Sequence, residues 1–378
     1  MAAGRAARNV LLYAASETDA DILYPTGFFA PDPFLFVQKG RTRILVMSDL
    51  ERDRARNQAR VDRVLAWSAV AKRIEAAGQK PTAASVIARV LRDLQLKRVE
   101  VPRRFPLGLA MELDALGLRL DLVDDPFWPE REIKRPEEVR AVTEALRAAE
   151  AGLEAGLSAL RACRIGRDGW LRRNGRKFTA EDLRAAVNTR IMAAGCVPAH
   201  TICAPGDQAV DPHEEGHGPI RAHTPVVMDI FPRSERTGYF GDLTRTVVRG
   251  RASSRLQDVY ALVNEGVRLG HRRIRDGVDG QAIHREIQAL FDARGYRTGV
   301  KQGRMQGFFH GTGHGVGLEI HEAPSISTRP STLRAGHTVT VEPGLYYLGL
   351  GGVRLEDVAL VTKTGSRNLT RVPKFLEL

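Results

Sequence analysis

Five residues in the second half of the chain carry side chains of the kind that hold divalent cations. They are Asp229, Asp242, His314, Glu342 and Glu356. Four carboxylates and one imidazole form a donor set that suits hard and borderline metal ions. Because the acids lie in or beside apolar runs that favour β-strands, they are costly to bury as anions unless a cation neutralises them. Two divalent cations held close together would offset that charge and activate water as a nucleophile at neutral pH.

The first two acids flank a predicted hairpin. Asp229 ends the apolar run Pro225–Met228, and Asp242 precedes the run Leu243–Val248. The turn-rich segment between them predicts that the two strands are neighbours, which would set the carboxylates opposite each other. For any one such acid alone, a structural carboxylate paired with an arginine is the simpler interpretation.

The last two acids repeat this arrangement in a second pair of predicted strands. Glu342 follows Thr338–Val341, and Glu356 lies within the run Val353–Val358. The recurrence of the pattern, with an imidazole between the two pairs, favours one shared metal centre over separate ion pairs.

A glycine-rich stretch from His310 to Glu322 surrounds the imidazole of His314. Its glycines permit a close approach of the backbone beside a compact site. A phosphate-binding loop is disfavoured because no Lys-Ser/Thr pair follows the glycines. The spacing of His310, His314 and His321 also differs from that of the helical HExxH zinc motif.

These segments resemble the motifs of the M24 "pita-bread" metallopeptidases, specifically the Xaa-Pro branch that contains prolidase and aminopeptidase P. The segments follow the family's order and cover the C-terminal two-thirds of the chain. Residues 9–123 resemble the family's N-terminal domain more loosely, chiefly through Asp21–Gly27. The matching segments are Met228–Ile230, Gly241–Thr246, His310–Glu322, Val341–Gly344 and Gly352–Asp357.

The resemblance implies a role for each of the five candidate ligands. Asp229 would chelate one metal ion, Asp242 and Glu356 would bridge both ions, and His314 and Glu342 would bind the other. The family therefore implies two divalent ions for each chain. Manganese is the expected ion, although the donor set is also compatible with cobalt, iron or zinc.

The resemblance also implies which residues take part in the reaction. Glu342 would accept a proton from the attacking water, and His321 would stabilise the oxyanion that forms from the carbonyl group. His213 would bind substrate or assist departure of the proline nitrogen. His217 and His223 are alternatives for this upstream histidine.

Further residues are candidates for contact with substrate. His310 matches the substrate-shielding histidine of the Xaa-Pro branch. Arg354 would support the carboxylate of Glu356 or meet the carboxylate of a substrate. A dipeptidase needs a cation for the C-terminal carboxylate of its substrate, and Arg329 and Arg334 are candidates for that role.

Two predicted domains position these residues, with the boundary in the proline- and acid-rich segment after Asp124. Residues 1–128 alternate β-rich and helical runs, which is typical of an α/β domain. Strands are predicted at Val10–Tyr13, Arg43–Met47, Val99–Val101 and Leu118–Val123. Helices are predicted at Ala55–Ala76, Thr82–Leu94 and Leu109–Leu116, and turns at Tyr24–Gly27 and Pro31–Pro33.

Residues 129–378 contain an order of elements that occurs twice: two helices and then a strand pair with carboxylates. One helix begins near Pro136, and the next begins at Thr179 with a capping box and ends at Gly195. The second set comprises helices at Ser254–Ile274 and Gln281–Ala293 and strands at Gly317–Ile320, Thr338–Glu342 and Val353–Val361. We expect an α+β pita-bread catalytic domain with an internal pseudo-twofold duplication and its site between the halves.

Composition excludes several other classes of protein. The net charge of +12 comes from arginines interspersed with acids, which indicates solvated helix faces rather than a nucleic-acid interface. No apolar run is long enough to span a membrane, and Val10–Ala15 is interpreted as a first strand rather than a signal peptide. Three cysteines, Cys163, Cys196 and Cys203, without CxxC spacing favour a reducing cytoplasm over a disulfide framework.

The predicted function is hydrolysis of the bond between an N-terminal residue and proline in short peptides. The compact length favours an Xaa-Pro dipeptidase over an aminopeptidase that acts on longer peptides, and the resemblance suggests a homodimer. A metal-free creatinase-like hydrolase, a methionine aminopeptidase and a pita-bread binding module without activity are the alternatives. Retention of all five ligands argues against the first and last, and the large N-terminal domain argues against the second.

Overall fold

A computed structural model describes residues 8–378 of the chain, which fall into two compact units. The first unit ends at Arg131 and the second comprises Glu132–Leu378, so the division lies a little beyond the boundary predicted at 128/129. Residues 1–7, which begin the predicted first domain, lie outside the described residues. The predicted catalytic residues all fall in the second unit.

The described part of the first unit is a six-stranded sheet in the order β4-β3-β2-β1-β5-β6, with helices packed against it. β1, β2 and β3 are antiparallel, and β4, β5 and β6 each join a neighbour in parallel. The strands are β1 Arg8–Ala14, β2 Phe34–Gly40, β3 Thr42–Met47, β4 Arg63–Ala66, β5 Arg98–Pro102 and β6 Arg119–Val123. The helices are α1 Ala20–Thr26, α2 Asp49–Gln58, α3 Trp67–Glu75, α4 Ala83–Asp93 and α5 Leu107–Ala115, followed by the 3-10 turn η1 Pro129–Arg131.

Two sequence predictions in this unit are wrong. The helix predicted at Ala55–Ala76 is interrupted, because α2 ends at Gln58 and β4 intervenes before α3. The turn predicted at Tyr24–Gly27 is the last turn of α1, where Gly27 ends the helix with φ of +58°. Pro25 has no N–H to donate to the carbonyl of Asp21, and the indole of Trp128 donates to that carbonyl at 2.7 Å instead. A tertiary contact therefore completes the helix.

The first half of the second unit places two helices against a three-stranded antiparallel sheet in the order β11-β12-β14. The helices are α6 Pro136–Arg161 and α7 Ala180–Met192, and the strands are β11 Ile202–Pro205, β12 Pro225–Ile230 and β14 Leu243–Val248. The capping box predicted at Thr179 is confirmed. Gly152 and Gly156 allow the helices to pack closely, since a Cβ atom at either would lie within 3 Å of an α7 side chain.

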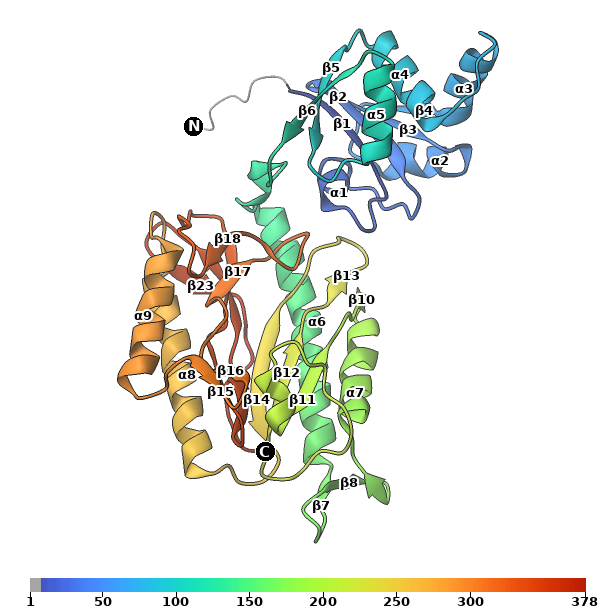
Figure 1. The fold of residues 1–378 in the computed structure, drawn as a ribbon. Helices are drawn as coiled ribbons and strands as arrows, with labels where there is room; N and C mark the ends of the chain where they lie inside the picture. The colour runs from blue at the N-terminus through green and yellow to red at the C-terminus, as the bar shows by residue number, and fades with distance from the viewer. Residues whose placement is uncertain (1–7) are drawn as a thin grey trace. The chain divides into compact units, whose positions relative to one another are not determined.

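The second half places α8 Ser254–Arg273 and α9 Gly280–Ala293 against a five-stranded sheet in the order β18-β17-β19-β22-β23. In Figure 1, α8 and α9 lie side by side on one flank of the strands, and α6 and α7 lie on the other. The strands are β17 Gly313–Gly315, β18 Glu322–Ile326, β19 Thr338–Val341, β22 Asp357–Val361 and β23 Ser366–Asn368, with a separate hairpin of β20 Gly344–Tyr347 and β21 Gly351–Arg354.

The two halves of the second unit are joined along β14. The backbone N–H of Glu356 donates to the carbonyl of Thr244 at 3.0 Å, and the hydroxyl of Thr246 donates to the carbonyl of Arg354 at 2.9 Å. We call these contacts the β14 seam. The seam brings the end of the second half's hairpin beside the strand that follows Asp242.

Two strand predictions in this unit also need correction. Gly317–Ile320 is not a strand but the bend between β17 and β18, and Val353–Val361 is two strands separated at Leu355 and Glu356.

The short elements that remain are β7 Arg164–Ile165, β8 Leu171–Arg173, β9 Arg176–Lys177, β10 Cys196–Val197, the 3-10 turn η2 Gly206–Val210, β13 Arg233–Ser234, β15 Gly299–Lys301 and β16 Arg304–Gln306.

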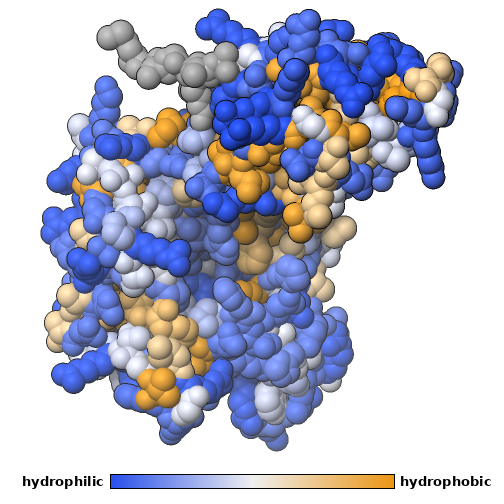
Figure 2. Space-filling view, turned by 45° about the horizontal axis from the view of Figure 1, so that its top comes forward, coloured by the Kyte–Doolittle hydropathy of each residue, from blue (hydrophilic) through white to orange (hydrophobic). Residues whose placement is uncertain are grey.

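The surface, the helices and the cysteines can each be compared with what the composition led us to expect. Figure 2 shows a face that is mostly hydrophilic, with hydrophobic residues in separate patches. Among residues 8–378, no helix combines the length and the apolar character that crossing a bilayer requires. Cys163, Cys196 and Cys203 are all buried and unpaired.

Candidate active site

All five candidate metal ligands line one cavity of about 860 Å³ in the second unit. Asp229 lies in β12, and Asp242 immediately precedes β14. His314 lies in β17, Glu342 immediately follows β19, and Glu356 lies between β21 and β22. Both halves of the unit therefore contribute acids to the same cavity.

The predicted hairpin between Asp229 and Asp242 is present, but the two acids are not directly opposite. The register of β12 and β14 pairs Asp229 with Thr244 and Ile230 with Leu243. Asp242 thus lies two positions from Thr244, and side chains two apart on a strand share a face of the sheet. The carboxylates are diagonal neighbours.

Asp242, His314 and Glu356 form the tightest group in the cavity. Each offers one ligand atom, and these three atoms lie within 4.8 Å of one another. His314 Nε2 is 3.7 Å from Asp242 Oδ2 and 3.1 Å from Glu342 Oε1. His314 Nδ1 lies 3.0 Å from the carbonyl of Gly315 and donates to it, which leaves Nε2 directed at the acids.

Thr340 on β19 fixes two of these residues. Its hydroxyl accepts a hydrogen bond from the backbone N–H of His314 at 3.0 Å and donates to Glu342 Oε1 at 3.1 Å. The backbone N–H of Glu342 donates to the carbonyl of Thr312 at 2.7 Å. The pairing of β17 with β19 thus sets the distance between the imidazole and its nearest carboxylate.

The cluster has more negative charge than the protein balances. Burial, followed by repulsion from Asp229, raises the pKa of Asp242 well above its usual value. Burial and the neighbouring acid Asp242 raise the pKa of Glu356 in the same direction. Burial would lower the pKa of His314, but Glu342 and Asp242 outweigh it and raise that pKa to about 9. Burial likewise opposes ionisation of Glu342, yet the hydrogen bond and charge of His314 lower its pKa to about 2.

One carboxylate oxygen in the cluster has no hydrogen-bond partner. Glu356 Oε2 accepts from the hydroxyl of Thr244 at 2.8 Å, but the buried Glu356 Oε1 accepts nothing. An unsatisfied buried carboxylate oxygen is strongly unfavourable, and a bound cation would satisfy it. The donor set and this oxygen together fit divalent metal ions.

Arg354 connects the acid Asp229 to a chain of hydrogen bonds on the other wall. Its Nη2 donates to Asp229 Oδ2 at 2.6 Å, and its Nη1 donates to the hydroxyl of Tyr346 at 2.9 Å. Arg354 therefore supports the carboxylate of Asp229, whereas the sequence led us to expect support of Glu356 or contact with a substrate carboxylate. The guanidinium is buried, with 3% of the residue exposed.

The chain continues from Tyr346 to His310. The hydroxyl of Tyr346 lies 2.8 Å from His310 Nε2, and His310 Nδ1 lies 2.7 Å from the carbonyl of Gly311. Since a carbonyl only accepts, Nδ1 carries the proton and Nε2 accepts from Tyr346. Burial lowers the pKa of His310 to about 4, which keeps this tautomer neutral. Tyr346 was not predicted as a site residue. The signal in the sequence was a tyrosine within an apolar strand, whose hydroxyl needs a buried partner.

The other predicted histidines differ in position. His213 lines the cavity, whereas His217 lies near Glu214, with Nδ1 3.3 Å from Oε1, and His223 Nδ1 accepts from the backbone N–H of Arg251 at 2.9 Å, both outside it. His321 also lines the cavity, with its ring 4.4 Å from that of His314 and almost perpendicular to it.

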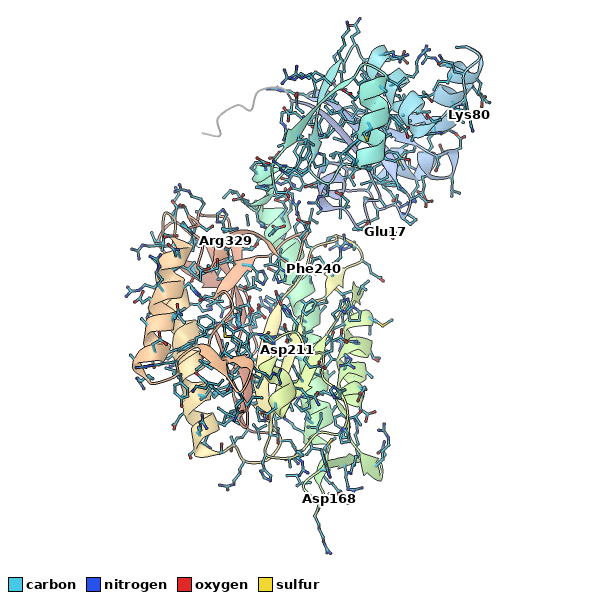
Figure 3. The ribbon with its side chains drawn as sticks, viewed as in Figure 1. Glu17, Lys80, Asp168, Asp211, Phe240 and Arg329 are labelled. Atoms are coloured by element: carbon cyan, nitrogen blue, oxygen red, sulfur yellow. The ribbon has the colours of Figure 1, made fainter. Side chains whose placement is uncertain are left out.

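Additional residues line the cavity that the sequence analysis did not single out, including Asp211, which Figure 3 labels between the two halves of the unit. The predicted substrate-binding cations Arg329 and Arg334 do not line it. Figure 3 labels Arg329 on the segment that follows β18. Further lining residues include His200, Ile202, Glu215, Phe231, Phe309, Ser325 and Ser327.

The chain is similar to known peptidases in sequence. The sequence profile of metallopeptidase family M24 matches residues 139–363. An Xaa-Pro dipeptidase of Pyrococcus horikoshii is 27% identical over 285 residues, which cover 74% of this chain and 75% of that protein. An uncharacterized peptidase of Bacillus subtilis is 37% identical over 142 residues, and the match spans only 37% of either protein.

Solved structures share the fold over nearly the whole chain. An X-Pro aminopeptidase from Thermotoga maritima superposes with a TM-score of 0.82 at 22% identity, covering 98% of this chain and 97% of that one. An Xaa-Pro dipeptidase from Bacillus anthracis gives a TM-score of 0.81 at 24% identity, covering 98% and 95%. The predicted α/β domain followed by a pita-bread domain is confirmed. With its profile match over more than half of its length, the chain belongs to metallopeptidase family M24.

Proposed function

We propose that this protein is a metal-dependent peptidase that hydrolyses the bond between an N-terminal residue and a following proline. The observation that carries the proposal is the convergence of four acids and an imidazole on one cavity, with a buried carboxylate oxygen that lacks a donor. The similarity to an Xaa-Pro dipeptidase over three-quarters of that protein supports the choice of substrate.

In this proposal, Asp229, Asp242, His314, Glu342 and Glu356 hold two divalent ions. By analogy with the branch that its motifs resemble, Asp242 and Glu356 would be the ligands common to both ions. These two residues and His314 each offer one ligand atom within 4.8 Å of the others. When bound, such a pair supplies a water nucleophile at neutral pH and polarises the carbonyl group that is attacked. We propose manganese as the ion, which an oxygen-rich donor set with one imidazole accommodates.

The remaining steps depend on the chain's own side chains. Glu342, which lines the cavity, would accept the proton of the attacking water at a carboxylate oxygen. His321 lies beside His314 and stabilises the charge that develops on the carbonyl oxygen. His213, which lines the cavity, binds the substrate or assists departure of the proline nitrogen. Arg354, Tyr346 and His310 hold Asp229 in place through the hydrogen-bond chain.

Two further properties belong to this proposal. Buried cysteines without disulfides are compatible with the reducing cytoplasm, where we place the enzyme. By analogy with the branch that its motifs resemble, we propose a homodimer, which sedimentation of the purified protein would test.

A hydrolysis panel tests the proposed activity. The purified protein with added Mn²⁺ should cleave Ala-Pro-Ala and leave Ala-Ala-Ala essentially intact. Equal rates on both peptides would contradict the selectivity for proline. Metal analysis of the same sample separates the alternatives, since a peptidase should carry about two transition-metal ions per chain. A metal content near zero after purification with manganese would favour a metal-free hydrolase or a binding module.

A further inference from the structure

The cavity is rich in acids and poor in available cations. The described residues that line it include six carboxylates and, from the lysines and arginines, only Arg354. Two bound divalent cations would still leave these groups with one formal negative charge. The six acids are Asp211, Glu215, Asp229, Asp242, Glu342 and Glu356.

The guanidinium of Arg354 is already fully engaged. It donates to the carboxylate of Asp229, to the hydroxyl of Tyr346 and, at 3.3 Å, to the carbonyl of Pro212. If it turned toward a substrate, the partly buried acid Asp229 would lose its only arginine partner among the described residues, which is unfavourable. Arg354 is therefore a structural cation and not a receptor for a ligand.

Two of the imidazoles that line the cavity are engaged as well. Both ring nitrogens of His310 have partners, in Tyr346 and Gly311. His200 Nδ1 lies 2.9 Å from Glu215 Oε1. These rings cannot offer a strong ion pair to an incoming carboxylate without losing an existing partner.

The wall formed by β18 offers neutral groups. In the register of β17 and β18, Ser325 is paired with His314, so it lies beside the metal cluster. The hydroxyls of Ser325 and Ser327 are 3.0 Å apart, and both residues line the cavity. Hydroxyl groups can bind the amide and carbonyl groups of a peptide, but they do not neutralise a carboxylate.

We propose that this enzyme acts on peptides of three or more residues and discriminates against the free carboxylate of an Xaa-Pro dipeptide. The inference rests on the proposed Xaa-Pro hydrolysis and reverses the preference for dipeptides that chain length suggests. A dipeptide would place its terminal carboxylate close to the cleaved bond, in an acidic cavity whose described lining has no lysine and whose one arginine is already engaged. A longer peptide presents a neutral amide at that position, and a cavity of about 860 Å³ has room for it.

Three substrates with the same scissile bond test the proposal: Ala-Pro, Ala-Pro-amide and Ala-Pro-Ala. We expect kcat/KM for the amide and the tripeptide to exceed that for Ala-Pro by about tenfold or more, since each substitution removes one unpaired charge. An Ala-Pro rate equal to or above that of the amide would overturn the inference and leave the proposed function standing. Failure to cleave any of the three by an enzyme loaded with Mn²⁺ would overturn both.

A gain-of-function variant tests the role of the β18 wall. Ser325→Arg should place a cation beside the cluster and raise the ratio of kcat/KM for Ala-Pro to that for Ala-Pro-amide by about tenfold. If Ser325→Arg lowers the melting temperature of the protein, Ser327→Arg, at a second position on the same wall, tests the same expectation. Arg329→Ser, outside the cavity, should leave the ratio unchanged. If Ser325→Arg and Ser327→Arg both fold and neither changes the ratio of kcat/KM for Ala-Pro to that for Ala-Pro-amide, the proposed role of the β18 wall is contradicted.

Discussion

Glu356 and Asp357 are consecutive and equally buried, each 1% exposed, yet they lie in opposite electrostatic environments. The carboxylate of Asp357 accepts a hydrogen bond from Arg245 Nη2 at 2.9 Å and pairs with Lys374. Although burial opposes its ionisation, the neighbouring bases His271, Arg245 and Lys374 lower the pKa of this carboxyl well below its usual range. The chain supplies all the positive charge that this acid needs.

The neighbours of Glu356 are acids. Burial first, and then Asp242 and Glu342, raise its pKa well above the usual value, and its Oε1 has no donor. The two residues differ in partners and not in depth. The contrast separates these two neighbouring acids: Asp357 has cationic partners beside it, whereas the charged groups that raise the pKa of Glu356 are other acids.

The largest expected effect comes from neutralising Glu356. Glu356→Gln should reduce kcat/KM by at least about 10³-fold, because it removes a shared ligand from the proposed metal pair. The metal-free variant should nevertheless be at least as stable as the metal-free wild type, since the neutral amide relieves repulsion from Asp242 and Glu342. Urea denaturation after chelation checks this. A metal-free variant that is several kcal/mol less stable would contradict the comparison.

The matching substitution at the next residue should act in the opposite way. Asp357→Asn breaks a buried pair with Arg245 and leaves that cation uncompensated, so we expect a loss of about 3–5 kcal/mol in the free energy of unfolding. Urea denaturation of the same metal-free preparations gives the comparison. A loss below about 1 kcal/mol would mean that the bases beside Asp357 are not its stabilising partners.

The pH dependence of stability sharpens this second prediction. Folding lowers the pKa of Asp357, so its ion pairs add stability that is fully present above the usual carboxyl pKa of about 4. That stability is lost as the pH falls below this value. The difference in stability between wild type and Asp357→Asn should therefore narrow below about pH 4. A difference that stays constant to about pH 2 would contradict the assignment.

A smaller effect on activity is expected when one hydroxyl is removed from the hydrogen-bond chain of Arg354, Tyr346 and His310. Tyr346→Phe removes the acceptor for Arg354 and the donor for His310, and we expect kcat to fall about 10- to 100-fold with little change in Tm. Tyr347→Phe is the matched control, because its hydroxyl donates to the carbonyl of Arg297 and does not line the cavity. It should change kcat less than about twofold. Equal effects of the two substitutions would exclude a positioning role for Tyr346.

The smallest effect separates the two upstream histidines. His213→Ala should lower kcat/KM about three- to tenfold, as expected for loss of one hydrogen bond to substrate. His217→Ala should have no measurable effect, because His217 is exposed outside the cavity. A larger loss for His217→Ala than for His213→Ala would transfer the proposed role to His217.

The five proposed ligands, which line one cavity, could be singled out in the sequence because each lies in a short motif in or beside a strand. Asp229, Glu342 and the pair of helices before each set of strands are where the apolar patterns place them. The family resemblance, rather than an apolar pattern, pointed to His213, which lines the cavity. These features depend on local periodicity and on spacing, which a sequence records directly.

The features that sequence did not predict depend on contacts between distant segments. Pro25 is tolerated in α1 because Trp128, far along the chain, donates to the freed carbonyl. Tyr346 and Arg354 belong to one hydrogen-bond chain only because the hairpin of β20 and β21 brings them together. Likewise, the strand β4 within the predicted helix forms because β3 provides a parallel partner. Local pattern carries no record of such partners.

The β14 seam links residues that are more than a hundred positions apart, since Thr244 bonds to the side chain of Glu356 across 112 residues. Neither half of the second unit can assemble the cluster alone, because each contributes only part of the ligand set. Closing such a long loop costs conformational entropy. Contacts between residues so far apart in the sequence therefore form slowly during folding. Uptake of metal by this enzyme should therefore report complete folding of the unit, and a truncated or partly folded chain will be recognised by its inability to retain the ions.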